Sequence, residues 1–252
     1  MKGSISIAIA VYNRERYLAQ TIESVLAQSR SDFELVIWDD GSTDRSLLIA
    51  KRYEESDPRV KVFSSAHMAG PHALISALEE TSGDYVGWVD SDDYIDQRAL
   101  AETSAILDSE PEVGLVYTDY LVVDTAGKIL GLGNHCKRPY SPMTMLVEFI
   151  TFHFRLLRRS VYDLAGGPDP AFESAFDYDI CLRMTEAAEV RHVQIPLYYY
   201  RTHRETISKQ KRITQISCTQ QTILNALKRR GLESVYELDL EILERYRLVR
   251  KK

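Results

Sequence analysis

The sequence has little cysteine and lacks the segments that would place it in several common classes of protein. Its cysteines, Cys136, Cys181 and Cys218, are few, odd in number and widely spaced in a chain of 252 residues. This usage argues against a disulfide framework or a zinc site and suits a reducing compartment. No apolar run approaches the ~20 residues that span a bilayer, and residues 1–11 lack a signal-peptide cleavage site. We therefore expect a soluble, cytoplasmic protein.

Two common nucleotide-binding fingerprints are also missing. The first apolar run ends at Val11, and the polar residues Tyr12 to Glu15 follow it where a dinucleotide fold would have a glycine-rich turn. The chain also contains no P-loop. These absences remove NAD enzymes and P-loop NTPases from the leading candidates.

The charge is divided unevenly along the chain. Residues 201–252 hold 13 Lys or Arg against 6 Asp or Glu, whereas residues 1–200 hold 18 against 31. An acidic body argues against general nucleic-acid binding. The basic tail is suited to an anionic membrane surface, a partner protein or the acidic body itself.

Strand and helix signals alternate along the chain, which predicts an α/β fold with a doubly wound, mostly parallel sheet. Apolar runs predict strands at 4–11, 33–38, 60–63, 83–89, 113–117, 190–195 and 196–200. Helical spacing or helix-start signals predict helices at 17–28, from 44, 71–81, 98–107, 178–187 and 213–252, the last with a break at Gly231. Ser42 or Thr43 is expected to cap the helix that begins near Asp44. Residues 127–142 are expected to be irregular.

The run from Gly83 to Asp93 is the centre of the functional interpretation. A short buried strand leads into three carboxylates within four positions, Asp90, Asp92 and Asp93. If the strand continues, Asp90 and Asp92 point to the same side of it, and two such carboxylates suit Mg2+ or Mn2+ together with substrate phosphates. Open α/β sheets bind ligands beyond the carboxyl ends of their strands, which favours this reading over a solvated acidic turn.

Five motifs in one order resemble those of a family 2 glycosyltransferase of the GT-A fold, over roughly residues 3–208. They are Val11-Tyr12-Asn13-Arg14-Glu15, Asp39-Asp40-Gly41-Ser42-Thr43-Asp44, Asp90-Ser91-Asp92-Asp93, Phe176-Asp177-Tyr178-Asp179 with Arg183, and Tyr200-Arg201 with His203. Each motif is weak alone, but five in order are specific.

The resemblance implies a donor site for a nucleotide-diphosphate sugar. Residues implied to contact the donor are Ala10, Tyr12, Asn13, Glu15, Asp40, Asp90, Ser91 and Arg201. In this reading Asp40 accepts an N–H of the base, Asp92 binds the metal directly, and Asp90 is shared between ribose and metal. Mn2+ or Mg2+ would bridge the diphosphate and neutralise charge on the leaving nucleotide.

The resemblance also implies roles for two later residues. Asp177 is implied to be the general base, which takes a proton from an acceptor hydroxyl while the sugar carbon is attacked from the opposite face, so that the anomeric configuration inverts. His203 is implied to reach the metal or the diphosphate, with a structural histidine as the alternative. For Arg201 a salt bridge to the acidic body stays an alternative to phosphate binding.

The sequence departs from the family pattern at three places. Phe176 stands where a Glu is usual, and Ala10-Val11 replace Pro-Thr. A frequent Arg-Asn pair falls near Leu74-Ile75, so that His67 or His72 is a candidate for the missing contact to the donor. Residues 152–155 offer aromatic rings and a charge for an acceptor sugar, with a half-buried strand as the alternative.

The resemblance predicts a catalytic domain at 1–208, with a nucleotide-binding half up to about residue 110 and an acceptor half at 111–208, and a basic helical extension at 209–252. A saccharide or lipid-linked acceptor is implied. We expect the extension to pack on the body or to pair subunits in a homodimer, ahead of docking at the inner face of a membrane. Two alternatives to a glycosyltransferase are a nucleotidyltransferase and a catalytically silent sugar-binding or partner-binding module.

Overall fold

The fold is taken from a computed structural model, which describes residues 2–68, 71–203 and 212–239. Its strands are β1 (Ile5–Val11), β2 (Phe33–Asp39), β3 (Val60–Ser64), β4 (Tyr85–Trp88), β5 (Tyr94–Ile95), β6 (Val113–Val123), β7 (Ile129–Leu132), β8 (Arg155–Arg158) and β9 (Glu189–Arg201). Its helices are α1 (Leu18–Leu26), α2 (Ser46–Ser56), α3 (His72–Glu79), α4 (Ala99–Ser109), the short 3-10 helix η1 (Asn134–Lys137), α5 (Pro142–Val147), α6 (Arg159–Ala165), α7 (Phe176–Ala187) and α9 (Arg212–Arg229).

One mixed sheet joins the strands of the described segments. Its order is β3-β2-β1-β4-β8-β6-β9-β5, and β7 pairs with β6 beside this path. The first four strands of the order are mutually parallel, β8 runs antiparallel to both β4 and β6, and β6 runs parallel to β9. The predicted α/β class with a mostly parallel sheet is confirmed.

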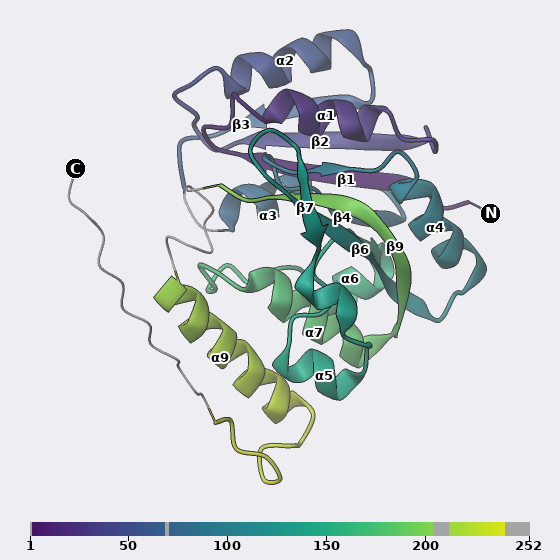
Figure 1. Cartoon of the computed structure of the whole chain (residues 1–252), viewed down its shortest axis with the longest axis vertical. Coiled ribbons are helices and arrows are strands. Elements are labelled where there is room, and N and C mark those ends of the chain that lie inside the picture. Colours follow the sequence, from purple (N-terminus) through teal and green to yellow (C-terminus); the bar gives the residue numbers. More distant parts are fainter. Residues whose placement is uncertain (1, 69–70, 204–211, 240–252) are drawn as a thin grey trace.

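Two apolar layers cover the two faces of the sheet. Along β1, Ile5, Ile7 and Ile9 face the layer that contains α1, α2 and α4, whereas Ala8 faces the layer that contains α3, α5, α7 and α9. This alternation follows from the period of two along a strand. Figure 1 shows α1 and α2 on one side of β1 to β3, with α6 and α7 on the other.

Several predicted element boundaries are wrong. One continuous strand, β9, replaces the two predicted at 190–195 and 196–200, because Pro196 lies where the pairing register with β6 shifts and the strand runs on past it. Residues 127–142 are not uniformly irregular, since they contain β7 and η1. Neither Ser42 nor Thr43 caps α2; the helix begins at Ser46, whose N–H donates to the carboxylate of Asp44 at 2.8 Å.

The predicted helical extension is confirmed only in part. Helix α9 packs on α7, with Ile223, Ala226 and Leu227 buried in the shared apolar layer, and Arg229 and Arg230 pair with Glu186. Residues 232–239 are not helical, contrary to prediction, and the rest of the predicted helix, 240–252, lies outside the described residues. The described part of the basic tail therefore packs its apolar face on the body and pairs two of its arginines with a glutamate there, as the packing alternative predicts.

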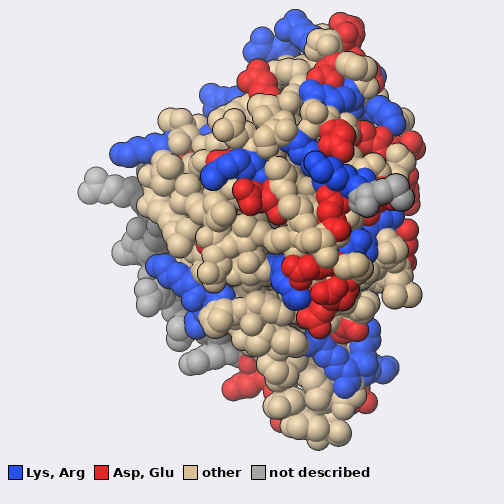
Figure 2. Space-filling model, turned by 90° about the vertical axis from the view of Figure 1, so that its right-hand side faces the viewer, with Lys and Arg blue, Asp and Glu red and all other residues tan. Residues whose placement is uncertain are grey.

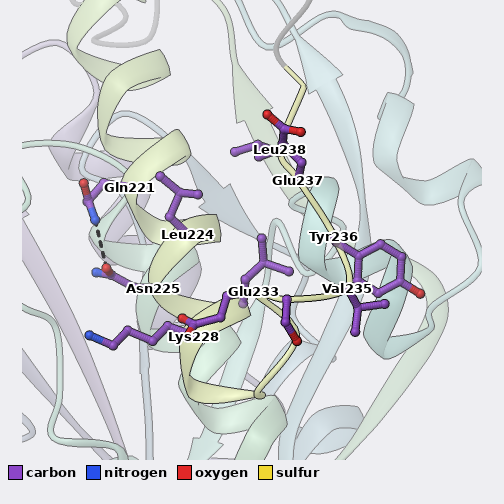
Figure 3. A pocket seen from close by; sticks show the side chains of 11 residues that line it. Gln221, Leu224, Asn225, Lys228, Glu233, Val235, Tyr236, Glu237 and Leu238 are labelled. Carbon is purple, nitrogen blue, oxygen red and sulfur yellow. Dashed lines mark hydrogen bonds between the residues drawn. The ribbon is translucent and has the colours of Figure 1, made fainter.

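Figure 2 shows basic and acidic side chains interspersed over the face that it presents. A hollow of about 950 Å³ lies between α9 and residues 233–238, where Leu224 and Val235 line it and Gln221 bonds to Asn225 (Figure 3). Among the described residues, no helix combines the length and apolar character that crossing a bilayer would require.

Candidate functional site

A cleft of about 270 Å³ opens at the carboxyl ends of β1 and β4, the edge at which α/β sheets bind ligands. Six residues that the sequence predicts for the site line this cleft together, namely Ala10, Asp90, Ser91, Asp92, Asp177 and Arg201. Asn13, Glu15 and His203 line a neighbouring hollow of about 540 Å³. Arg14 lines both cavities. Residues from four separate parts of the chain thus meet at one place.

The prediction that Asp90 and Asp92 point to the same side assumed that strand β4 continues through the three carboxylates. It does not. β4 ends at Trp88, and the N–H of Asp93 donates to the carbonyl of Asp90 at 3.0 Å, which closes a turn. The alternation of side chains along a strand therefore cannot orient Asp90 and Asp92. Ser91 is buried within the turn, and its carbonyl accepts a hydrogen bond from Thr21.

Asp92, implied to bind the metal, lies beside His203, the histidine implied to reach the metal or the diphosphate. His203 Nε2 is 2.8 Å from Asp92 Oδ2, and Arg14 Nε donates to the same oxygen at 3.1 Å. Burial alone would raise the pKa of Asp92, but the hydrogen bond from His203 and the charge of Arg14 outweigh it and hold that pKa below the usual range. Asp92 is thus an ionised carboxylate held between the guanidinium group of Arg14 and the imidazole of His203.

Asp93 anchors the acidic turn, Asp90 to Asp93, to strand β9. It is 1% exposed, and its carboxyl group accepts hydrogen bonds from Tyr198 Oη at 2.8 Å and from the N–H of Arg201 at 2.7 Å. Burial and the neighbouring charges of Asp92 and Asp90 raise the pKa of Asp93 well above its usual value. Asp93 therefore holds the acidic turn against β9.

The guanidinium group of Arg201 is directed at the scaffold. It donates to the carbonyl of Asp92 at 2.7 Å and to Gln20 at 2.7 Å, and it lies over the rings of Tyr17 and Tyr94. Arg201 is 3% exposed. These contacts give it a role in fixing the position of Asp92, while the predicted contact with the donor stays a prediction.

Asp90 has a second neighbour that the sequence did not indicate. Its Oδ2 lies 3.5 Å from Nε2 of His153. Loss of solvation in the cleft and the charge of Asp92 raise the pKa of Asp90. Ligand atoms of Asp90, Asp93 and His153 all lie within 4.8 Å of one another, which makes this a group of described residues with the spacing of a metal site. Burial and the Arg155 charge lower the pKa of His153 well below its usual value, which keeps the imidazole neutral.

The carboxylate oxygens at this turn fit a hard divalent cation, since oxygen ligands are those that Mg2+ and Mn2+ prefer. The predicted ligands Asp92 and His203 meet, and Asp90 lies in the same turn. Asp93 and His153 are 1% and 4% exposed, and Asp93 already accepts two hydrogen bonds. Asp90 and Asp92 line the cleft with side chains 46% and 18% exposed, so their oxygens can reach a cation that also contacts a substrate, whereas Asp93 is enclosed. The side chain of His203 is as buried as that of His153, and its contact with a metal stays a prediction.

Asp177 reaches the cleft from the first turn of α7. A carboxylate in this turn is stabilised by the helix dipole. Asp177 Oδ2 is 3.4 Å from both terminal nitrogens of Arg155, whose side chain is 1% exposed and lies against the faces of Trp88 and Phe149. A buried cation therefore stands directly behind the predicted base.

Sequence reasoning missed the parts played by Arg14 and Arg155. Arg155 had a detectable signal, because it is a charged residue inside the run Phe152 to Leu157, and a charge in such a run requires a partner once it is buried. The structure also limits the acceptor hypothesis for this run. Phe154 is fully buried and offers no ring to a sugar, whereas Phe152 does line the cleft.

The first loop and the second motif are tied together. Asn13 adopts a φ of 53°, and its Oδ1 accepts the N–H of Thr43 at 2.8 Å. Glu15 accepts two hydrogen bonds from Arg45, at 3.1 Å from the main chain and 3.0 Å from Nε. Tyr12 is 39% exposed and stacks on His67, which also contacts the buried carboxyl group of Asp40. Asn13 and Glu15 therefore hold the loops that carry Tyr12 and Asp40.

Comparison with known proteins now identifies the family. Residues 6–164 match the family described as glycosyl transferase family 2, and the chain belongs to that family. It is 28% identical over 229 residues to a chondroitin synthase of Escherichia coli. This match covers 91% of this chain and 33% of that protein. The chain thus spans about a third or less of the length of the curated relatives that it matches first.

Solved structures confirm the GT-A fold. S. aureus TarS 1-349 in complex with UDP-GlcNAc superposes with a TM-score of 0.68 at 20% identity, over 90% of this chain and 72% of that one. A mannosyltransferase from Pyrobaculum calidifontis in complex with GDP-Man and Mn2+ gives a TM-score of 0.61 at 15% identity, over 94% and 77%. At these identities the likeness concerns the fold alone.

Proposed function

We propose that this chain is an inverting, metal-dependent glycosyltransferase that moves a sugar from a nucleotide-diphosphate donor, above all a UDP-sugar, to a saccharide or lipid-linked acceptor. One observation carries the proposal. An acidic turn with Asp90 and Asp92 and a carboxylate on a helix start, Asp177, line the same cleft. Family membership and the nucleotide sugars named for two proteins of the same fold support it.

The donor half of the reaction uses the first two motifs and the acidic turn. The exposed ring of Tyr12 offers a stacking face for a base, and the carboxylate of Asp40 accepts a base N–H. Asp90, Asp92 and His203 would hold Mn2+ or Mg2+. When bound, such a cation neutralises the charge that develops on the diphosphate. Arg201 and Asp93 keep the turn in place through the carbonyl of Asp92 and the N–H of Arg201.

The acceptor half uses Asp177. Its carboxylate accepts the proton of an acceptor hydroxyl while the hydroxyl oxygen bonds to the anomeric carbon and the carbon–oxygen bond to the diphosphate breaks. Attack and departure take place on opposite faces of the sugar, so the configuration inverts. The guanidinium group of Arg155, 3.4 Å away, places a countercharge beside the carboxylate of Asp177.

We further propose that residues 1–208 are the catalytic domain and 209–252 an extension, and that the product belongs to cell-envelope polysaccharide. The chondroitin synthase among the relatives supports a polysaccharide product. We place the enzyme in the cytoplasm, at the inner face of the membrane if its acceptor is lipid-linked.

The test measures turnover of labelled UDP-sugars with saccharide acceptors, with and without Mn2+, in two charge-matched variants. Asp92→Asn should abolish the part of turnover that depends on the metal. Asp163→Asn, on the exposed surface of α6, removes the same charge away from the cleft and should leave turnover unchanged. Unaltered metal-dependent turnover in Asp92→Asn would refute the metal assignment.

A further inference from the structure

The turn at Asp40 is covered by the segment that follows β3. The N–H of Met68 donates to Asp40 Oδ1 at 2.8 Å, and Nδ1 of His67 lies 2.6 Å from Asp40 Oδ2. Gly41, with a φ of 70°, permits this approach, since a Cβ there would stand 2.7 Å from the backbone nitrogen of His67. Both carboxylate oxygens of Asp40 are therefore engaged by the chain itself.

His67 makes a second contact in the same place. Its ring lies 3.9 Å from the ring of Tyr12, centroid to centroid, with an angle of 15° between the planes. Rings in contact are separated by about 3.5–4 Å, the optimal distance between carbon atoms. No further planar group fits between Tyr12 and His67 without moving one of them.

The two contacts of His67 are those that the proposed function requires of a nucleotide base. A base would stack its planar ring on Tyr12 and direct a ring N–H at the carboxylate of Asp40. The imidazole already presents a planar ring to Tyr12 and a ring nitrogen to Asp40. The Asp40 side chain is only 7% exposed, so the approach to it lies where His67 now stands.

We propose that His67 occupies the base position in the donor-free protein and has to leave when the nucleotide binds. It is then an intrinsic competitor that sets donor affinity and selects ligands whose base makes both contacts better than imidazole does. The inference rests on the proposed function, because it takes Tyr12 and Asp40 as the base site. If His67 has left the base position in only a fraction of the molecules, the measured affinity for the nucleotide is lowered by that fraction.

The direction in which removal of His67 changes the affinity for UDP distinguishes a competitor of the base from a residue that supports the base. If His67 competes, His67→Ala should bind UDP about tenfold more tightly, the factor that corresponds to about 1.4 kcal/mol. If His67 instead supports the base from its other face, removing it should weaken binding. His67→Phe keeps a ring on Tyr12 but cannot bond to Asp40, so its gain in affinity should be smaller than that of His67→Ala.

The experiment is isothermal titration of the full chain with UDP in the presence of Mn2+. The control variant is Arg52→Ala, which removes an exposed basic side chain on α2 and should bind UDP as the wild type does. Tighter binding by His67→Ala, with Arg52→Ala unchanged, supports the proposal. Equal or weaker binding by His67→Ala overturns it while leaving the donor site in place. Failure of the wild type and of His67→Ala alike to bind UDP overturns both the donor site and the competitor.

Discussion

Replacing Asp177 with Asn should destabilise the fold as well as remove the proposed base, because a buried cation depends on that carboxylate. The side chain of Arg155 is 1% exposed and that of Asp177 is 24% exposed, and the ion pair joins them at 3.4 Å. Removing one partner of a fully buried pair costs about 3–5 kcal/mol. A coupled set of variants tests whether this pair behaves in that way.

The magnitude follows from the geometry of the pair. Strong charge-assisted bonds have N–O distances of about 2.7–2.9 Å, and 3.4 Å is longer. Asp177 also faces solvent, and Asn retains a carbonyl oxygen that accepts from Arg155. We therefore expect Asp177→Asn to lower the free energy of unfolding by about 1–2 kcal/mol. Arg155→Met keeps most of the volume but loses the contacts with Trp88 and Phe149, so it should cost about 2–3 kcal/mol.

The assay is urea unfolding at pH 7 of the wild type, both single variants and the double variant. Because the two singles remove one shared interaction, the double variant should cost about 1 kcal/mol less than the two losses added together. A loss below about 0.5 kcal/mol in Asp177→Asn, together with strict additivity, would refute the idea that Asp177 carries the countercharge for Arg155.

Two further predictions concern the sheet and the turn at Asp40. Burial opposes ionisation of Glu34, but hydrogen bonds from Lys61, Ser6 and Ser82 outweigh it and lower its pKa to about 2. The ionised Glu34 side chain should therefore contribute about 1–2 kcal/mol to the free energy of unfolding above pH 4.5, and this contribution should disappear as the pH falls from 4.5 towards 2. Unfolding of Glu34→Gln and of the wild type across this pH range checks the prediction. A difference between the two proteins that stays constant with pH would contradict it. Gly41→Ala should cost about 1–3 kcal/mol through its positive φ and its clash with the His67 backbone; thermal unfolding checks this, and an unchanged stability would show that the two segments separate freely.

Strand and motif order could be predicted from the sequence because they depend on local patterns. The apolar runs at β1 and β2 and the polar residues after them place Tyr12 and Asp40 at one edge of the sheet. The same logic failed where a local signal was overruled by pairing. Two strands were predicted at 190–195 and 196–200, yet β9 continues past Pro196 beside β6 because the register shift there accommodates the missing N–H.

Contacts between distant segments could not be read from local patterns. Arg14 and His203 both meet Asp92, although they lie far from it in the sequence. These partners distinguish the carboxylates of the acidic turn, since Asp92 contacts Arg14 and His203, whereas Asp93 is buried against β9. The alternation of side chains along a strand does not contain this difference between Asp92 and Asp93.

The proposed glycosyl transfer is tested most directly by measuring donor binding and turnover in one variant, Asp177→Asn, at a temperature where it stays folded. A base acts on the acceptor, so the affinity for a UDP-sugar should stay within about threefold of the wild type while release of UDP falls by about 100-fold or more. Turnover at the wild-type rate, or a collapse of donor affinity that accounts for the whole loss, would contradict the assignment of Asp177 as the base.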